Sequence, residues 1–252
     1  MPHILNSRTV LVTGGAKRIG RAICRAFAEH GATVIIHYRH SQAEAEALRE
    51  ELRQHGDDHV AIQADLTIPE QRRKLIARSL EINGQLDFLV NNASVYRRSR
   101  LRDVNDEEAR KDFDINFFAP FALMRDFANC KGNGSIINLL DQRVAKADPA
   151  AGTYGLAKKA LRDATEAAAV EWAPEIRVNG ISPGVVLPPP GVSKEKMVPI
   201  LKGVPMQTNT TPEEIANACI YLATAETVTG TILNVDGGLH LVTPLHGEKR
   251  PS

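Results

Sequence analysis

Short apolar runs rich in β-branched residues alternate along this chain with longer segments whose apolar residues repeat with a helical period. That alternation is typical of a parallel sheet with helices packed on both faces. The short runs predict strands at Thr9–Thr13, Thr33–His37, Val60–Gln63, Leu86–Asn91, Ser135–Leu139, Arg177–Ile181 and Thr231–Val235. The longer segments predict helices at Arg18–His30, Gln42–His55, Pro69–Asn83, Asp106–Asn129, Thr153–Ala173 and Pro212–Ala223. The sequence therefore predicts an α/β fold around a doubly wound, about seven-stranded parallel sheet.

The chain is predicted to form a single domain over residues 1–252, because no internal repeat or linker interrupts the alternation. A chain of 252 residues with 43% apolar content can bury a sizeable core. Two helix starts carry a cap signal, Thr67 ahead of Pro69 and Thr211 ahead of Pro212.

Composition excludes several classes of protein. Lys plus Arg number 31 and Asp plus Glu 30, so no strong field would attract nucleic acid or an anionic membrane. The three cysteines and the scattered histidines show no metal-ligand or disulfide spacing, so no metal site is expected. No leader-like segment and no run of about 18 apolar residues is found. We expect a cytoplasmic protein whose partner is a small molecule rather than a nucleic acid or a membrane.

A glycine-rich turn, Thr13–Gly20, joins the first predicted strand to the first helix. Glycines there let the backbone approach a pyrophosphate, and the helix N-terminus offers N–H donors to it. An incidental tight turn would not need both Gly14 and Gly20 at that junction. The turn therefore predicts a dinucleotide site, with Gly14, Lys17, Arg18, Ile19 and Gly20 against the cofactor.

The end of the second strand indicates which dinucleotide binds. An NAD enzyme is expected to place an acid there for the ribose 2′-hydroxyl, but this chain has Tyr38, Arg39, His40 and Ser41. A guanidinium matches the 2′-phosphate of NADP in both charge and shape, so Arg39 and Arg18 favour NADPH. The alternative is that both arginines are solvated surface residues.

A proline- and glycine-rich stretch, Pro183 to Thr211, follows a predicted strand directly. Ligands of open α/β sheets lie outside the carboxyl ends of the strands. Residues 185–211 are therefore a candidate substrate lid, with an ordinary solvated loop as the alternative.

These motifs, taken in order, resemble the short-chain dehydrogenase/reductase family from Thr13 to Gly238. The matching residues are the glycine-rich turn, Asp65-Leu66, Asn91-Asn92-Ala93, Asn116, Tyr154-x-x-x-Lys158 and Pro183-Gly184. The resemblance implies a Rossmann-like fold and a homotetramer. It also implies that Asp65 borders the adenine, that Asn91 and Ala93 border the ribose, and that Asn116, Tyr154 and Lys158 act in catalysis. Leu66, Ser94, Pro183 and Gly184 are expected beside the cofactor on the same ground.

Two departures from the usual family pattern resemble its pteridine reductase branch. Arg18 replaces a glycine of the turn, and Asp141 stands thirteen residues before Tyr154, where most members have a serine. The string His37-Tyr38-Arg39-His40-Ser41 also fits that branch. The resemblance implies that Tyr96 stacks on a pterin ring, and the expected substrate contacts are Tyr96, Asp141, Tyr154 and Val185.

Tyr154 and Lys158 are four residues apart on a predicted helix, so both side chains project from one face. An ammonium about 4 Å from a phenol stabilises the phenolate by up to roughly 4 kcal/mol at an effective dielectric near 20. Lys158 is therefore expected to lower the pKa of Tyr154, whose reference value is about 10.

Asp141 is the most informative residue of the expected site. A carboxylate beside Tyr154 would repel the oxyanion of a ketone reduction, but it suits a heterocycle whose N–H groups need an acceptor. The hypothesis is that Asp141 orients such a ring and works with Tyr154 in its protonation. The alternative is a structural carboxylate paired with Arg143 or with a backbone amide.

Three functions remain in competition. The leading hypothesis is NADPH-dependent reduction of a pterin or dihydropteridine C=N bond by hydride transfer. A general carbonyl or enoyl-thioester reductase is the second, which Asp141 and Tyr96 disfavour. The third is a non-catalytic NADPH-binding sensor, which has no need for Asn116, Tyr154 and Lys158 together.

Overall fold

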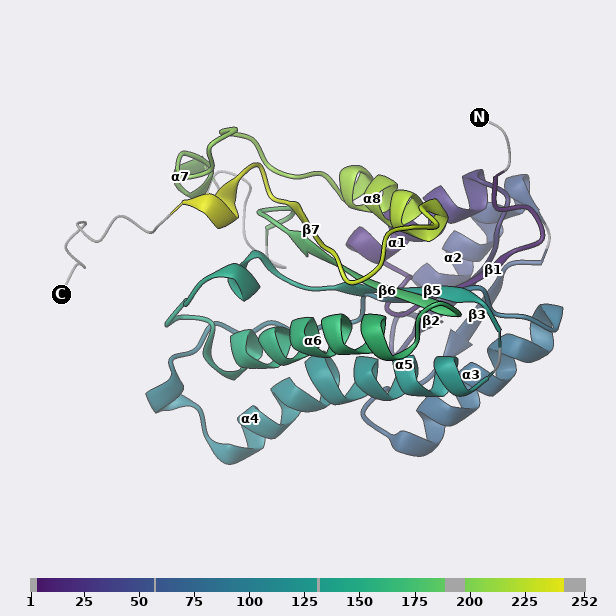
Figure 1. Ribbon diagram of the computed structural model, residues 1–252, viewed down its shortest axis with the longest axis horizontal. Coiled ribbons are helices and arrows are strands. Elements are labelled where there is room, and N and C mark those ends of the chain that lie inside the picture. Colours follow the sequence, from purple (N-terminus) through teal and green to yellow (C-terminus); the bar gives the residue numbers. More distant parts are fainter. Residues whose placement is uncertain (1–3, 57, 131, 189–197, 243–252) are drawn as a thin grey trace.

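Seven parallel strands form one sheet, in the order β3-β2-β1-β4-β5-β6-β7 (Figure 1). The computed structural model describes residues 4–56, 58–130, 132–188 and 198–242. The strands are β1 Thr9–Val12, β2 Thr33–Tyr38, β3 Val60–Gln63, β4 Phe88–Asn91, β5 Gly134–Leu139, β6 Ile176–Pro183 and β7 Ile232–Val235. The fold is therefore a single Rossmann-like α/β domain, as the alternation of the sequence predicted.

The helices cover both faces of the sheet. In Figure 1, α1 Arg18–Glu29, α2 Gln42–Leu52 and α8 Pro212–Thr224 lie on one side. On the other side lie α3 Pro69–Asn83, α4 Asp106–Phe113, α5 Ala119–Asn129 and α6 Gly152–Glu171. A short helix, α7 Val198–Leu201, lies within the predicted lid. No helix in the described ranges is long and apolar enough to cross a membrane.

The period of two along each strand divides the core into two layers. In β1, Val10 and Val12 pack into the cluster beneath α1, α2 and α8, whereas Leu11 packs into the opposite cluster. All three side chains are fully buried. A strand with helices on both faces has no solvent-facing side, which explains the continuous apolar run in place of an alternating one.

The predicted helix Asp106–Asn129 is interrupted. Between α4 and α5 the chain makes a π-helical turn, Asp114–Phe118, followed by Pro120 in the first turn of α5. Proline has no N–H to donate to the preceding turn, so it fits best at a helix start. The turn holds Asn116 fully buried, and π-helical turns are common at functional sites.

The lid prediction falls partly outside the described residues, because 189–197 are not among them. In the described part, Val204 is buried and Gln207 donates its backbone N–H to the Val204 carbonyl. Thr210 donates its N–H to the Val185 carbonyl, which joins the two ends of the segment. Residues 198–211 are thus packed onto the fold by specific contacts.

Candidate active site

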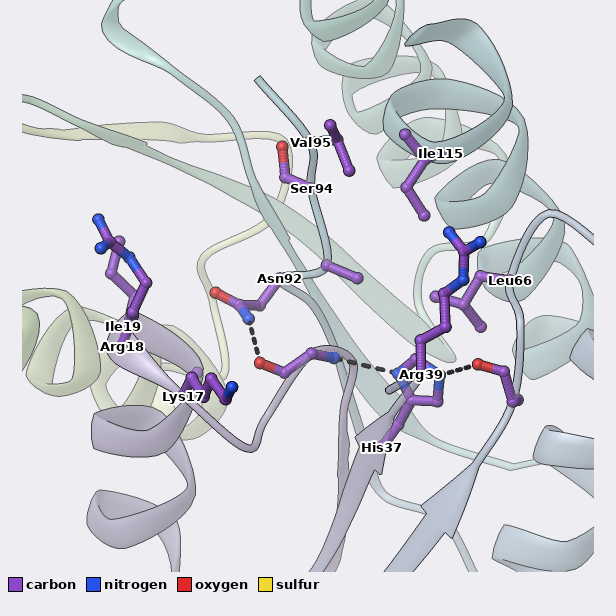
Figure 2. A pocket seen from close by; sticks show the side chains of 14 residues that line it. Lys17, Arg18, Ile19, His37, Arg39, Leu66, Asn92, Ser94, Val95 and Ile115 are labelled. Carbon is purple, nitrogen blue, oxygen red and sulfur yellow. Dashed lines mark hydrogen bonds between the residues drawn. The ribbon is translucent and has the colours of Figure 1, made fainter. Parts of the chain in front are cut away.

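Two adjoining cavities lie at the carboxyl ends of the strands, where the order of the sheet reverses between β1 and β4. Ligands of open α/β sheets bind at such a switch point. The first cavity has a volume of about 350 Å³ and lies over the glycine-rich turn (Figure 2). The second, of about 290 Å³, contains Asp141, Tyr154 and Lys158. Arg18, Ile19, Asn92 and Ser94 line both cavities, so the two form one continuous site.

The glycine-rich turn forms a cradle that a side chain would fill. Gly14 has a φ of +61°, which favours glycine. A Cβ on Gly20 would lie 2.2 Å from the Gly14 carbonyl oxygen, so the start of α1 packs directly on the turn. Arg18 also has a left-handed φ of +55° and donates to the Pro188 carbonyl at 3.0 Å. A cradle with the N-terminus of α1 at its edge fits the pyrophosphate of a dinucleotide.

Asn92 holds the turn from the side of β4. Its Nδ2 donates to the carbonyls of Thr13 and Gly14 at 2.9 and 3.0 Å. The Thr13 hydroxyl accepts the backbone N–H groups of Asn92 and Ala93 in return. These four bonds lock the loops after β1 and β4 together. The side chain of Asn91 is buried and donates to Asn138 Oδ1 at 2.8 Å, and its place beside the cofactor stays a prediction.

The far end of the first cavity is basic. Arg39 lines it, and its Nε pairs with Asp65 Oδ2 at 3.1 Å. Burial acts to raise the pKa of Asp65, but hydrogen bonds from Thr67 and the Arg39 charge outweigh it and lower that pKa. Leu66 also lines the cavity, whereas Tyr38 is buried in the sheet, and His40 and Ser41 lie outside the lining residues. Arg39 thus lies at the wall of this cavity, and its contact with a 2′-phosphate stays a prediction.

We predict that Arg39→Ala weakens the binding of NADPH about 10- to 100-fold, because a charge-assisted hydrogen bond is worth roughly 1.5–3 kcal/mol. The binding of NADH, which lacks the 2′-phosphate, should change by less than about twofold. Fluorescence titration with both cofactors measures the difference. Arg73→Ala is the control, because it removes an equally positive side chain whose Nη2 pairs with Glu70 on the same helix. An equal loss for NADH and NADPH would show that Arg39 does not contact the phosphate.

The second cavity joins three titratable side chains. The Tyr154 hydroxyl donates to Asp141 Oδ2 at 2.9 Å. Lys158, one turn further along α6, donates to the Leu139 carbonyl at 2.7 Å and is fully buried. The Tyr96 ring packs edge-on against the Tyr154 ring, with centroids 4.9 Å apart. The cavity thus holds a proton donor, a carboxylate, an ammonium and an exposed aromatic wall.

The electrostatics of this cluster differ from the expectation for Tyr154. Burial raises the pKa of Tyr154 well above its usual value, and the Asp141 carboxylate raises it further. Burial lowers the pKa of Lys158 to about 8. The expected lowering of the Tyr154 pKa was therefore wrong, because burial and, after it, the Asp141 carboxylate outweigh any effect of Lys158. Tyr154 keeps its proton throughout the neutral range and is suited to donating it.

Arg143 was expected as the alternative partner of Asp141, and it lies behind the second cavity, where it contacts two of the residues that line it, Asp141 and Tyr96. Its backbone N–H and Nη1 bond Asp141, and its Nε bonds Asp148 at 2.7 Å. Its guanidinium lies 5.0 Å from the centre of the Tyr96 ring, within the range of a cation–π contact. Asp141 thus has the ion pair of the structural alternative as well as the contact with Tyr154.

Asn116 and Val185 do not line either cavity. Asn116 Oδ1 accepts from the Ser94 hydroxyl at 2.7 Å and from the Val95 N–H, and its Nδ2 donates to the carbonyls of Val95 and Asp112. Asn116 therefore holds the segment that carries Ser94 and Tyr96. On the other wall, Pro183 and Gly184 line the second cavity with Val186 and Leu187, while Val185 does not.

Sequence reasoning did not assign a role to His37 or Asn92, although both lie inside strings that it singled out. It gave Arg143 only as a possible partner of Asp141. Arg143 lies two residues after Asp141, and no periodicity marks it because the segment is a short 3-10 turn.

Comparisons with known proteins show which family this chain is similar to. Residues 14–240 match a family model described as enoyl-(acyl carrier protein) reductase. An uncharacterized oxidoreductase of Methylorubrum extorquens is 33% identical over 244 residues, covering 93% of this chain and 98% of its own. Versicolorin reductase 1 of Aspergillus parasiticus is 31% identical and covers 94% and 97%.

Among solved structures, FolM alternative dihydrofolate reductase 1 from Brucella canis, complexed with NADP, superposes with a TM-score of 0.90. It is 32% identical, covering 98% of this chain and 100% of its own. The Brucella suis protein, also in complex with NADP, gives 0.90 at 33% identity, with 96% and 98% covered.

Proposed function

This chain belongs to the short-chain dehydrogenase/reductase family and is an NADP-dependent oxidoreductase, and from that premise we propose that it reduces the ring C=N bond of a pterin or dihydropteridine. The observation that carries the proposal is the bond from the Tyr154 hydroxyl to the Asp141 carboxylate. An acid at this position is unfavourable for a ketone, whose developing oxyanion it would repel. It is favourable for a heterocycle that presents N–H groups.

In the proposed reaction, NADPH supplies the hydride to the ring carbon, and the enzyme supplies a proton to the ring nitrogen. Tyr154 holds that proton on its hydroxyl, because burial and Asp141 keep the phenol protonated. Lys158 is charged below a pKa of about 8 and stabilises the phenolate that remains. An ammonium has three N–H donors, and the Leu139 carbonyl takes one, so others are left for the nicotinamide ribose.

The acceptor sites of Asp141 explain how orientation and protonation are coupled. Oδ1 accepts the backbone N–H and Nη1 of Arg143, and Oδ2 accepts Nη1 and the Tyr154 hydroxyl. These contacts come from three donor groups, because Nη1 reaches both oxygens, whereas a carboxylate has about four acceptor sites. We propose that a ring N–H replaces the Tyr154 hydroxyl on Oδ2, so that the hydroxyl turns to donate to the ring. Binding of the ring would then direct the proton of Tyr154 toward it.

Tyr96 supplies the wall on which a flat ring would stack. Its side chain is 41% exposed, edge-on to Tyr154 and held by the Arg143 guanidinium. Planar heterocycles stack on aromatic faces, so this wall supports a pterin over a small aliphatic ketone. Both superposed Brucella structures bear the name dihydrofolate reductase, which supports the same class of substrate.

The proposal also covers the setting of the enzyme. We infer a cytoplasmic homotetramer that binds a small molecule and neither nucleic acid nor membrane. Exposed apolar side chains on α6 and around the start of α5 support association, namely Phe118, Phe121, Leu156 and Val170. Phe118 and Phe121 are three residues apart at the start of α5 and so share one face of it. Apolar surface gathered on one face of a soluble protein commonly marks an interface.

The test is NADPH oxidation with biopterin, dihydrobiopterin, dihydrofolate and simple diketones, comparing the wild type with Asp141→Asn. We predict that the wild type turns over the pterins and that Asp141→Asn lowers kcat/KM for them about 10- to 100-fold, the value of a charge-assisted hydrogen bond. The amide keeps the shape of the carboxylate but loses its charge and one acceptor oxygen.

Asp163→Asn is a matched control, because Asp163 is exposed on α6 and lines neither cavity. Turnover of diketones alone would support the carbonyl reductase alternative and refute the pterin proposal. NADPH binding without turnover of any compound would support the sensor.

A further inference from the structure

His37, near the end of β2, is a buried histidine whose two ring nitrogens are both bonded to backbone. Nδ1 accepts the N–H of Gly14 at 3.1 Å, and Nε2 bonds the Ala64 carbonyl at 3.0 Å. The side chain is 2% exposed, yet it lines the first cavity. Figure 2 shows both bonds as dashed lines, one toward the glycine-rich turn and one toward the end of β3.

The two partners fix the protonation state of this ring. The Gly14 N–H can only donate, so Nδ1 must carry a lone pair. The Ala64 carbonyl can only accept, so Nε2 must carry the hydrogen. The ring is thus the neutral Nε2–H tautomer, and burial, which lowers its pKa to about 4, keeps it neutral at physiological pH.

His37 holds the turn by its backbone as well. Its carbonyl accepts the N–H of Gly15 at 2.9 Å, so one residue holds two consecutive N–H groups of the turn. Asn92 holds the Gly14 carbonyl from the opposite side at 3.0 Å. Gly14 is therefore fixed through both its N–H and its C=O before any cofactor arrives. The first turn of α1 offers further N–H donors for a phosphate.

We propose that His37 is a positioning residue for the cofactor, whose neutral ring sets the glycine-rich turn against the ends of β2 and β3. These three segments supply Gly14, Arg39 and Leu66 to one cavity. Without the ring, the half-buried N–H of Gly14 would have no protein acceptor, and the turn would have to be ordered by the cofactor itself. A turn that is ordered before the cofactor binds should raise the affinity for NADPH, because less conformational entropy is lost on binding.

Three variants separate the two bonds of the ring. His37→Asn places an oxygen near Nδ1 and keeps the acceptor for Gly14. His37→Gln places an amide nitrogen near Nε2 and keeps the donor to Ala64. His37→Phe keeps the size of the ring and loses both. We expect the Kd of NADPH to rise about 10- to 100-fold for Phe and Gln and by less than about threefold for Asn, because the acceptor for Gly14 is the bond that counts.

The kinetic signature separates positioning from general destabilisation. The KM for NADPH should follow the Kd, while kcat at saturating NADPH and the KM of the second substrate stay within about twofold of the wild type. The Kd is measured by NADPH fluorescence without any second substrate. The inference therefore rests on NADP binding and stands or falls independently of the pterin proposal.

His59 provides a matched control. It is also buried, at 4% exposed, and its Nδ1 also accepts a backbone N–H, that of Val34, at 3.1 Å. It lines neither of the two active-site cavities. His59→Gln should lower the melting temperature and leave the Kd of NADPH unchanged.

Two results would overturn the proposal. One is that the three His37 variants lower the melting temperature but bind NADPH with the wild-type Kd, as His59→Gln should. The other comes from the wild-type protein and needs no variant to fold. A long-range 1H–15N correlation spectrum that shows His37 protonated on Nδ1 at neutral pH would exclude the bond from Gly14.

Discussion

Tyr154→Phe should lower the rate of reduction at saturating NADPH and substrate by about 100-fold to 10,000-fold, the usual contribution of a general acid. The phenylalanine keeps the ring that packs on Tyr96, so the wall of the cavity is preserved. The proton held beside Asp141 is lost. Stopped-flow absorbance of NADPH oxidation measures the rate, and a fluorescence titration should give an NADPH Kd within about twofold of the wild type.

The pH dependence gives the same prediction a second check. Because the pKa of Tyr154 lies well above its usual value, no loss of its proton should limit kcat/KM of the wild type below pH 10. The pKa of Lys158 is about 8, so its charge is present below pH 8 and is lost above it. Activity should therefore decline above pH 8 through Lys158. A Tyr154→Phe variant within about tenfold of the wild type would mean that the proton comes from another donor.

Gly20→Ala should abolish useful NADPH binding, with a Kd raised by more than about 100-fold, or roughly 3 kcal/mol. The added Cβ would lie 2.2 Å from the Gly14 carbonyl oxygen and 2.6 Å from Asn92 Nδ2. Neither group can move away from the added Cβ without a cost in free energy, because the carbonyl belongs to the backbone and the Asn92 side chain is hydrogen-bonded to the turn. Overpacking also costs about 1–3 kcal/mol of folding stability, which thermal unfolding would measure.

Gly84→Ala is the control for this substitution. Gly84 ends α3 with a φ of +69°, and a Cβ there would meet nothing within 4 Å. An alanine at this position would have a strained backbone, because φ is positive, but its Cβ would contact no other atom. Gly84→Ala should therefore lower the free energy of unfolding by about 1 kcal/mol and leave NADPH binding unchanged. If Gly20→Ala behaved in the same way, the cradle would not be as tight as the distances indicate.

The sheet and most helices could be predicted because their signals are local. β3 and α3 begin and end at the predicted residues, since the run Val60–Gln63 and the Pro69 start leave little choice. The cap at Thr211 also forms, as a reciprocal pair with Glu214. Thr67 was wrong as a cap, because its hydroxyl donates to Asp65 and Ile68 occupies the cap position.

The site was predictable to the level of motifs but not of contacts. The spacing of Tyr154 and Lys158 places them on one helix, whereas the pairing of Asp141 with Arg143 depends on a 3-10 turn with no periodic signal. Asn91 and Asn92 are neighbouring residues of the same type, so the sequence does not indicate which of them points toward the glycine-rich turn. Only the turn at the end of β4 decides that the first points into the core and the second toward the glycine-rich turn.

The buried amide pair Asn91–Asn138 has a consequence for how the chain reaches its fold. The two residues face each other across β4 and β5, and Asn138 Nδ2 also donates to the Thr165 hydroxyl on α6. A slip of one residue between these strands would separate the amides and leave them unpaired among apolar side chains, at about 1–3 kcal/mol for each group. Aliphatic neighbours would tolerate such a slip far better. The amide pair therefore favours the native register of β4 and β5 during folding, because a pairing shifted by one residue would leave both amides without their partner.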